Sequence, residues 1–136
     1  RLSFAKIIEK FFIESFSSKI EKSANIEDSA KIGNNVYIGH GCYIGNDVII
    51  ENNNVISHHS VIKDHCYITS QSIIAGHVTI ESNCYLGINC TIRNRIKLEK
   101  ECLIGAGAVI LKNTKEKEVY SANTVRLSGK SDELDF

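Results

Sequence analysis

A large aliphatic residue recurs at every sixth position through most of this 136-residue chain. The register begins at Ile20 and reaches Ile110 without a miss. Its members are Ile20, Ile26, Ile32, Ile38, Ile44, Ile50, Ile56, Ile62, Ile68, Ile74, Ile80, Leu86, Ile92, Leu98, Ile104 and Ile110. A period of six fits neither the 3.6-residue turn of an α-helix nor the alternation of a single strand, so it indicates a repeat architecture.

A second position, four residues after each large one, is small in all repeats except those with Asn54 and Ile96. This pairing predicts a short strand followed by a corner in each hexad, with the large and the small residue both pointing inward. Three strands then close a triangle of eighteen residues, and successive coils stack in parallel about 4.8 Å apart. A narrow interior explains the large and small pairing. Because one coil buries little, stability must come from the stacking of neighbours.

Several hexads carry glycine directly after the aliphatic residue, in Ile32-Gly33, Ile38-Gly39, Ile44-Gly45, Leu86-Gly87 and Ile104-Gly105. In this pattern the chain resembles the hexapeptide-repeat family over about seventy per cent of its length. The resemblance implies an all-β fold, a left-handed parallel β-helix of about five coils. Its left hand is taken from the family, since it opposes the usual crossover rule and periodicity does not reveal it.

The repeat divides the chain into three parts. Residues 20–115 are expected to form the β-helix, and residues 116–136, where the register is lost, a C-terminal cap and tail. In residues 1–19 an apolar stripe at helical spacing predicts a short helical cap over the open first coil, or alternatively a helix that leads to an upstream domain. Since the chain begins with Arg and has no Met, we expect it to be the C-terminal portion of a longer protein.

Composition narrows the classes of partner. The formal net charge is zero, so neither nucleic acid nor a membrane surface is expected as a partner, and no apolar run is long enough to span a bilayer. Charged residues interrupt the aromatic N-terminus, which argues against a signal peptide. All five cysteines occupy inward small positions, which predicts reduced core thiols and a cytoplasmic protein.

Outward positions of the strands carry two apolar columns, Ile49, Tyr67, Tyr85 and Leu103 in one and Val55, Ile73 and Val109 in the other. Exposed apolar columns of this length favour an interface between copies of the chain. The family resemblance implies a homotrimer of parallel prisms. The alternative is a set of surface β-formers without a partner.

Stacking at eighteen residues per coil gathers four of the five histidines on one corner. One column there contains His40, His58 and Gly76, followed by Asn94 and Lys112, and the column beside it contains His59, His77 and Arg95. Histidine accepts a proton near neutral pH, and a glycine N–H can donate to a developing oxyanion. His58 and Gly76 are expected one coil apart, about 5 Å, which suits an acyl carbonyl under attack.

The surrounding segments sharpen the resemblance. Residues 56–62, Ala75-Gly76 and residues 83–89 resemble the branch of sugar acetyltransferases that includes sialic-acid O-acetyltransferases and UDP-4-amino-sugar N-acetyltransferases. The resemblance implies that His58 is the general base, that Gly76 contacts the thioester carbonyl, and that acetyl-CoA binds between two prisms. Relatives commonly have an acidic residue directly after the base, whereas this chain has His59, which we include among the catalytic candidates.

Charge predicts which end of the prism binds the CoA phosphates. Residues 26–64 contain five acidic residues and two lysines, whereas residues 91–117 contain seven basic and three acidic residues. The C-terminal end is therefore favoured for phosphates, although a solvated mixed surface explains the same counts. The predicted cofactor-binding residues are Gly76, His77, Asn94, Arg95, Gly105, Ala106 and Lys112, and no residue is assigned to a metal.

The sequence thus predicts an acetyl-CoA-dependent acetyltransferase that acts on an amino or hydroxyl group of a sugar, with a nucleotide-activated sugar as the expected acceptor. Two alternatives remain open. One is a zinc enzyme like the γ-class carbonic anhydrases, for which His40, His59 and His77 share an edge, although the ligand spacing of that family is not reproduced. The other is a non-catalytic β-helix that serves as an assembly module.

Overall fold

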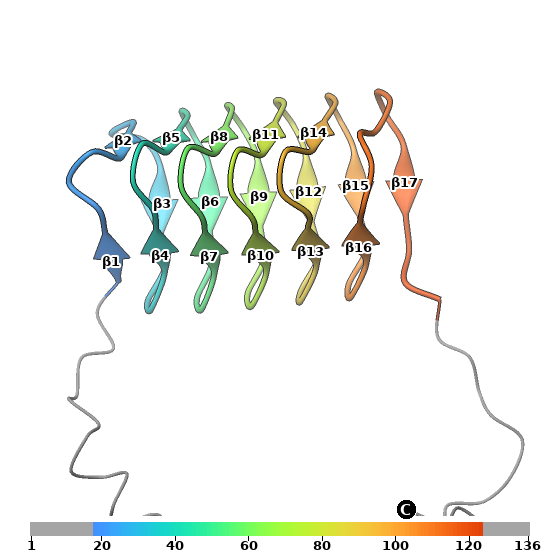
Figure 1. Cartoon of the computed structure of the whole chain (residues 1–136), viewed down its shortest axis with the longest axis horizontal. Helices are drawn as coiled ribbons and strands as arrows, with labels where there is room; N and C mark the ends of the chain where they lie inside the picture. Colours follow the sequence, from blue (N-terminus) through green and yellow to red (C-terminus); the bar gives the residue numbers. More distant parts are fainter. Residues whose placement is uncertain (1–17, 124–136) are drawn as a thin grey trace, which may run out of the picture.

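A computed structural model describes residues 18–123, and within this range the chain forms seventeen strands of two residues each and no α-helix. The strands wind into a parallel β-solenoid, which confirms the predicted all-β fold and agrees with a left-handed β-helix (Figure 1). No helix of the described range could cross a membrane. The predicted N-terminal helix and the tail from residue 124 onward lie outside the described residues.

The strands form three parallel sheets, which we call A, B and C. Sheet A consists of β1 (Lys19–Ile20), β4 (Tyr37–Ile38), β7 (Val55–Ile56), β10 (Ile73–Ile74), β13 (Thr91–Ile92) and β16 (Val109–Ile110). Sheet B consists of β2 (Asn25–Ile26), β5 (Tyr43–Ile44), β8 (Val61–Ile62), β11 (Thr79–Ile80) and β14 (Lys97–Leu98). Sheet C consists of β3 (Lys31–Ile32), β6 (Ile49–Ile50), β9 (Tyr67–Ile68), β12 (Tyr85–Leu86), β15 (Leu103–Ile104) and β17 (Val119–Tyr120).

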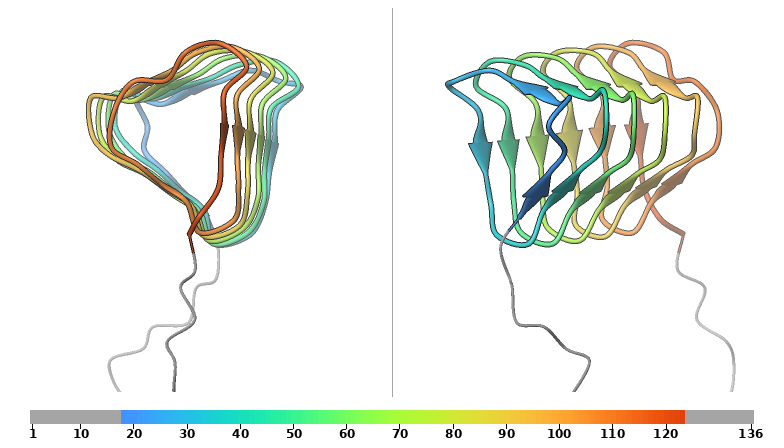
Figure 2. Two further views of the ribbon diagram at one scale, coloured as in Figure 1. Left: turned by 90° about the vertical axis from the view of Figure 1, so that its right-hand side faces the viewer. Right: turned by 60° about the vertical axis from the view of Figure 1, so that its left-hand side comes forward.

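Along the solenoid axis the coils superimpose as a triangle (Figure 2). Each of the strands β1 to β13 pairs with the strand eighteen residues later, as in the register of Val55 with Ile73. The period-six pattern therefore predicted the coil length correctly. The last coil differs, because Val119 of β17 pairs with Leu103, sixteen residues earlier, and no strand of sheet B is formed between β16 and β17. β17 thus adds a strand beyond the sixteen expected from the sequence.

The aliphatic register fills the interior. From Ile38 to Ile110 every member is at most 2% exposed, whereas Ile20, in the first described coil, is 44% exposed. Asn54, the polar exception in the small column, is fully buried because its amide donates to the Glu51 carbonyl and accepts from the Ser72 N–H. All five cysteines are buried and free, as predicted.

Four-residue corners join the strands. The A–B corner comprises residues 21–24, 39–42, 57–60, 75–78 and 93–96, the B–C corner begins with residues 27–30 and the C–A corner with residues 33–36, each repeated every eighteen residues. The third residue of most corner segments has a positive φ, as in His59 (56°), His65 (58°) and His77 (58°). This left-handed conformation lets the chain turn between sheets while the inward residues stay in register.

Candidate functional site

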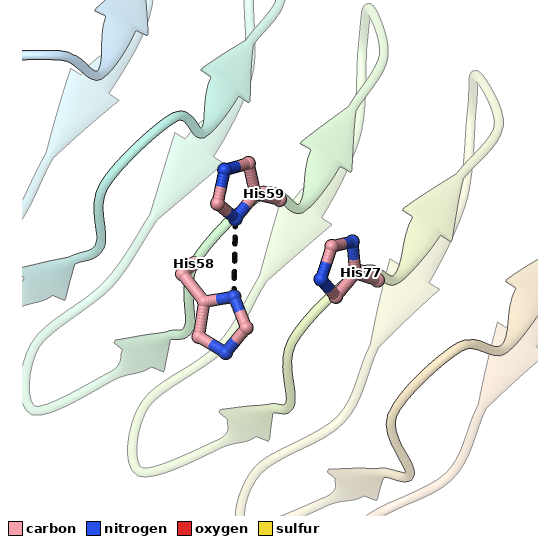
Figure 3. A group of neighbouring side chains, drawn as sticks. All are labelled: His58, His59 and His77. Carbon is pink, nitrogen blue, oxygen red and sulfur yellow. Dashed lines mark hydrogen bonds between the residues drawn. The ribbon is translucent and has the colours of Figure 1, made fainter.

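Four histidines project from the A–B corner, and His65 lies on the B–C corner beside Asp47. His58 and His59 belong to the segment between β7 and β8, His77 to the segment one coil later and His40 to the segment one coil earlier. All four side chains are exposed. The eighteen-residue stacking therefore placed the histidine cluster correctly, and Figure 3 shows three of its members.

His58 and His59 contact each other through their rings. Their Nδ1 atoms are 3.1 Å apart, and the ring planes are inclined at 82° (Figure 3). The His59 ring also stacks on His77, with centroids 5.0 Å apart and planes 6° apart, and His77 meets the edge of His58 at 5.1 Å. The three imidazoles thus form a mutually packed cluster across two coils.

The His58 imidazole lies directly against Gly76. A Cβ atom at position 76 would be 2.8 Å from both Cε1 and Nε2 of His58, closer than real Cβ contacts allow. Gly76 has no positive φ, so a side chain at this position would disturb the observed position of the His58 ring and not the backbone. The ring covers Gly76, which is buried. Within the described residues, the Gly76 N–H donates to no protein acceptor.

Backbone hydrogen bonds between coils hold the corner in place. The His59 N–H donates to the His40 carbonyl at 2.8 Å, and the His77 N–H donates to the His58 carbonyl at 3.0 Å. Both residues adopt the left-handed conformation described above. The two imidazoles of this column therefore start from equivalent backbone positions, which explains their parallel stacking.

Two supporting residues were not predicted from the sequence, Ser23 and Gly41. The Ser23 hydroxyl contacts Nδ1 of His40 and accepts the Gly41 N–H at 3.0 Å. Gly41 has a φ of 67°, and a Cβ there would lie 2.8 Å from Cδ2 of His59. Both residues share the column of His59 at eighteen-residue spacing, and this signal identifies them in retrospect.

The surroundings of His77 in the cluster shift the pKa of its imidazole. Loss of solvent around its imidazole, and then the positive charge of Arg95, lower the pKa of His77 below its ordinary value. The neighbouring imidazoles act in the same direction. His77 is therefore biased toward the neutral form, in which one ring nitrogen has a free lone pair.

The predicted cofactor-binding residues are divided between two corners. Asn94 and Arg95 are exposed on the A–B corner with His77, and Lys112 follows β16 at the same edge. Gly105 and Ala106 instead connect β15 to β16 on the C–A corner. One chain therefore does not bring all of these residues to one corner.

Basic side chains near the C-terminal end differ in whether they form ion pairs with acidic residues. Lys97 forms ion pairs with Glu81 and Glu99, while in the described range neither Arg95 nor Lys112 forms one. Arg95 and Lys112, which lie on the edge with the histidines, therefore remain available to a phosphate.

The histidines line neither of two hollows on the described surface. A hollow of about 390 Å³ lies beside β3 and β6 and includes Lys31 and Glu51 in its lining. Another, of about 250 Å³, lies at the C-terminal end and is lined by Lys112 and Tyr120 among others. The histidine cluster of a single chain is an open ridge, so a second surface is needed to enclose a ligand there.

A comparison with protein-family models identifies the family. The model described as the GMPPB C-terminal domain matches residues 16–125. The chain belongs to this family. No curated protein sequence matches this chain.

Solved structures share its solenoid fold. A variant of perosamine N-acetyltransferase from Caulobacter crescentus, in complex with CoA and GDP-perosamine, is 21% identical, with 85% of this chain and 57% of that chain covered and a TM-score of 0.62. The acetyltransferase domain of PglB from Neisseria gonorrhoeae, in complex with acetyl coenzyme A, is 19% identical, with 76% and 54% covered and a TM-score of 0.61. WeeI from Acinetobacter baumannii is 19% identical, with 85% and 57% covered and a TM-score of 0.51.

These likenesses confirm the fold that the sequence resemblance implied. This GMPPB C-terminal domain family member spans less than two thirds of the length of each of these three proteins.

Proposed function

We propose that this protein is an acetyltransferase that transfers the acetyl group of acetyl-CoA to an amino or hydroxyl group of a sugar, with a nucleotide-activated sugar as the expected acceptor. The observation that carries the proposal is the placement of the His58 ring against a bare glycine backbone, with its Nδ1 atom 3.1 Å from His59. The folds of named sugar acetyltransferases support it, and two perosamine N-acetyltransferase structures are variants with a replaced histidine and with CoA and GDP-perosamine bound.

In the proposed reaction His58 acts as general base. The reaction uses the tautomer of His58 in which Nδ1–H donates to Nδ1 of His59, 3.1 Å away, and the lone pair of Nε2 is available to the acceptor. As the acceptor nitrogen or oxygen attacks the thioester carbonyl, Nε2 takes its proton. The new C–N or C–O bond forms, the C–S bond breaks, and the CoA sulfur leaves with the proton from His58.

The backbone N–H of Gly76 is proposed to donate a hydrogen bond to the thioester carbonyl oxygen. Its N–H has no protein acceptor in the described range, so it is available to donate to an oxyanion once the His58 ring moves aside. Because Gly76 is buried, the proposal requires this movement to precede or accompany acetyl-CoA binding. Rotation of an exposed side chain is a fast event and adds little to the barrier.

The CoA moiety is proposed to extend from the histidines toward the C-terminal end. Arg95 and Lys112, which form no ion pair in the described part, would bind its phosphates, and His77 and Asn94 would contact the adjoining arm. Gly105 and Ala106 reach this path only if they come from the C–A corner of another copy.

A homotrimer is proposed for this reason. Sheet C presents Ile49, Tyr67, Tyr85, Leu103 and Val119 outward in one paired row, and each of them is at least 36% exposed. Sheet A adds Ile73 and Val109, which are 48% and 59% exposed. Packing of these faces between copies would bury them and enclose the open histidine ridge. We also propose a cytoplasmic location, which the five free cysteines support.

A non-catalytic module is the second candidate. The observation that favours it is that the two hollows described above contain none of the histidines, so these hollows enclose no ligand beside the cluster. It predicts no affinity for CoA.

The test is direct detection of acetylated product. The purified chain would be incubated with acetyl-CoA and a panel of amino sugars and nucleotide-linked amino and hydroxyl sugars, followed by mass spectrometry and by calorimetry with CoA. An acetyltransferase gives a product 42 mass units heavier with at least one acceptor and binds CoA. Absence of CoA binding, together with absence of product across the panel, would establish the non-catalytic alternative.

A further inference from the structure

The histidine cluster has the composition of a transition-metal site as well as that of a base. One ring nitrogen from each of His58, His59 and His77 lies within 4.8 Å of the others. Zinc binds imidazole nitrogens at about 2.0–2.1 Å, so two tetrahedral ligands are about 3.4 Å apart. His58 and His59 already approach this separation, with their Nδ1 atoms at 3.1 Å.

Side-chain rotations, without a change in the backbone, are what the cluster needs to coordinate an ion. The three side chains are exposed, and the only protein hydrogen bond recorded for their rings within the described residues is the one between His58 and His59. His77 lies one coil after His59 on the same corner, held by backbone hydrogen bonds between the coils. Because its ring now stacks parallel to that of His59, the His77 ring must turn to direct a nitrogen lone pair at an ion shared with His59.

We propose that His58, His59 and His77 bind one divalent transition-metal ion, with Zn²⁺ as the expected occupant, and that the bound ion inhibits the enzyme. Three imidazoles without a carboxylate select zinc, copper or nickel over magnesium or calcium. A water molecule completes the coordination from the solvent side. The site lies within one chain, and it differs from the set His40, His59 and His77 considered from the sequence, because His40 contacts Ser23 instead.

The positive charge of Arg95 limits the affinity of the proposed site for a metal ion. Arg95 follows His77 in the same column and acts on it electrostatically. A positive charge at that position opposes a bound cation, so we expect reversible binding in the micromolar range and not a permanently held ion.

Inhibition rests on the proposed function, whereas binding does not. A metal bound to the His58 ring breaks its hydrogen bond with His59 and takes the ring away from the acceptor, so proton abstraction stops. A chelator that removes the ion restores the ring and the activity.

Binding is measured by calorimetric titration of the untagged, reduced full chain with ZnCl₂ in a weakly coordinating buffer. The variants are His59→Asn and His77→Asn, because asparagine tolerates the positive φ of these positions. His65→Asn is the matched control, an exposed histidine at the same corner position with a φ of 58° on a different corner. Loss of one ligand should raise the dissociation constant for zinc at least about tenfold. The dissociation constant of the control variant should stay within about twofold of that of the unchanged chain.

The proposal predicts one ion per chain, with weaker binding in both cluster variants and not in His65→Asn. It is overturned if the chain binds no zinc, or if the cluster variants bind zinc as tightly as the unchanged chain. Circular dichroism confirms that each variant is folded before titration.

Activity measurements at rising zinc concentration test inhibition separately from metal binding. The rate of each protein at rising zinc is divided by its own zinc-free rate, and the unchanged enzyme should be inhibited at concentrations that leave His77→Asn active. Histidine-dependent binding without any effect on the rate overturns the inhibitory role. Histidine-dependent zinc binding in a chain that neither binds CoA nor acetylates an acceptor supports the metal site and refutes the acetyltransferase.

Discussion

The Nδ1 atom of His59 lies 3.1 Å from the Nδ1 atom of His58. The sequence resemblance implies an acidic residue at the position after His58, whereas in this chain a second imidazole occupies that position and contacts His58. A neutral imidazole accepts a hydrogen bond through one nitrogen, so His59 is able to orient His58 without a negative charge.

His59→Gly should lower kcat with little change in KM for acetyl-CoA. Glycine tolerates the φ of 56° and removes the ring, so the backbone is preserved while the hydrogen bond to His58 is lost. Loss of one hydrogen bond of about 1 kcal/mol corresponds to about a fivefold decrease in rate. His59→Asp restores an acceptor and should recover most of the loss. A purely structural role for His59 would instead give equal rates for the two variants in steady-state kinetics.

Gly76→Ala should impair activity more than it impairs stability. The added Cβ would lie 2.8 Å from the His58 ring, and the exposed ring can move away while the backbone, which has no positive φ, accepts alanine. The predicted result is a decrease in kcat of about tenfold or more with a melting temperature within a few degrees of the unchanged chain. Unchanged kinetics would show that the ring position against Gly76 has no role in the reaction.

Stability should depend on pH through Glu81. This carboxylate is 2.8 Å from the Lys63 ammonium and 3.5 Å from that of Lys97, and the hydrogen bond from Lys63 lowers the pKa of Glu81 below its ordinary value of 4.5. A lowered folded-state pKa gives a stabilisation that is present above pH 4.5 and is lost as pH falls through the folded-state pKa.

Glu81→Gln should therefore reduce the free energy of unfolding at pH 7 by about 1 kcal/mol and should reduce the difference between pH 7 and pH 3.5. Urea denaturation at the two pH values measures both quantities. Glu116→Gln removes an exposed partner of Lys117 and serves as the control. If the two variants show the same pH dependence, the assignment to Glu81 is wrong.

The oligomer interface should be sensitive to charge on sheet C and not on sheet B. Tyr85 lies in the middle of the outward row of sheet C, packed against the Tyr67 ring at 5.6 Å. Tyr85→Asp should dissociate the proposed trimer, because it places a charge in a buried apolar face. Thr79→Asp makes the matched change on sheet B. Sedimentation equilibrium distinguishes the two, and a monomeric unchanged chain would refute the trimer.

The period of six was sufficient to predict the solenoid, because each inward Ile or Leu and each small partner from Val36 to Ile110 is buried where the register places it. The same stacking placed His58, His59 and His77 on one corner. The end of the solenoid was not predicted, since β17 joins sheet C after a coil two residues shorter than the rest, and the register contains no information on such a shortening.

Side-chain direction was also beyond the sequence. Column positions gave the 5 Å separation of His58 from Gly76, but the ring orientation that closes this gap depends on rotamers, which periodicity does not specify. Gly105 and Ala106 were grouped with the histidine-corner residues through the family resemblance, and their separation from that corner follows from the position of β15 and β16.

The role of His58 is tested most directly by single-turnover acetyl transfer in His58→Ala and His65→Ala. The account predicts that His58→Ala loses at least about a hundredfold in rate while it still binds acetyl-CoA, and that His65→Ala keeps the full rate. A His58→Ala protein that transfers acetyl groups as fast as the unchanged chain would contradict it.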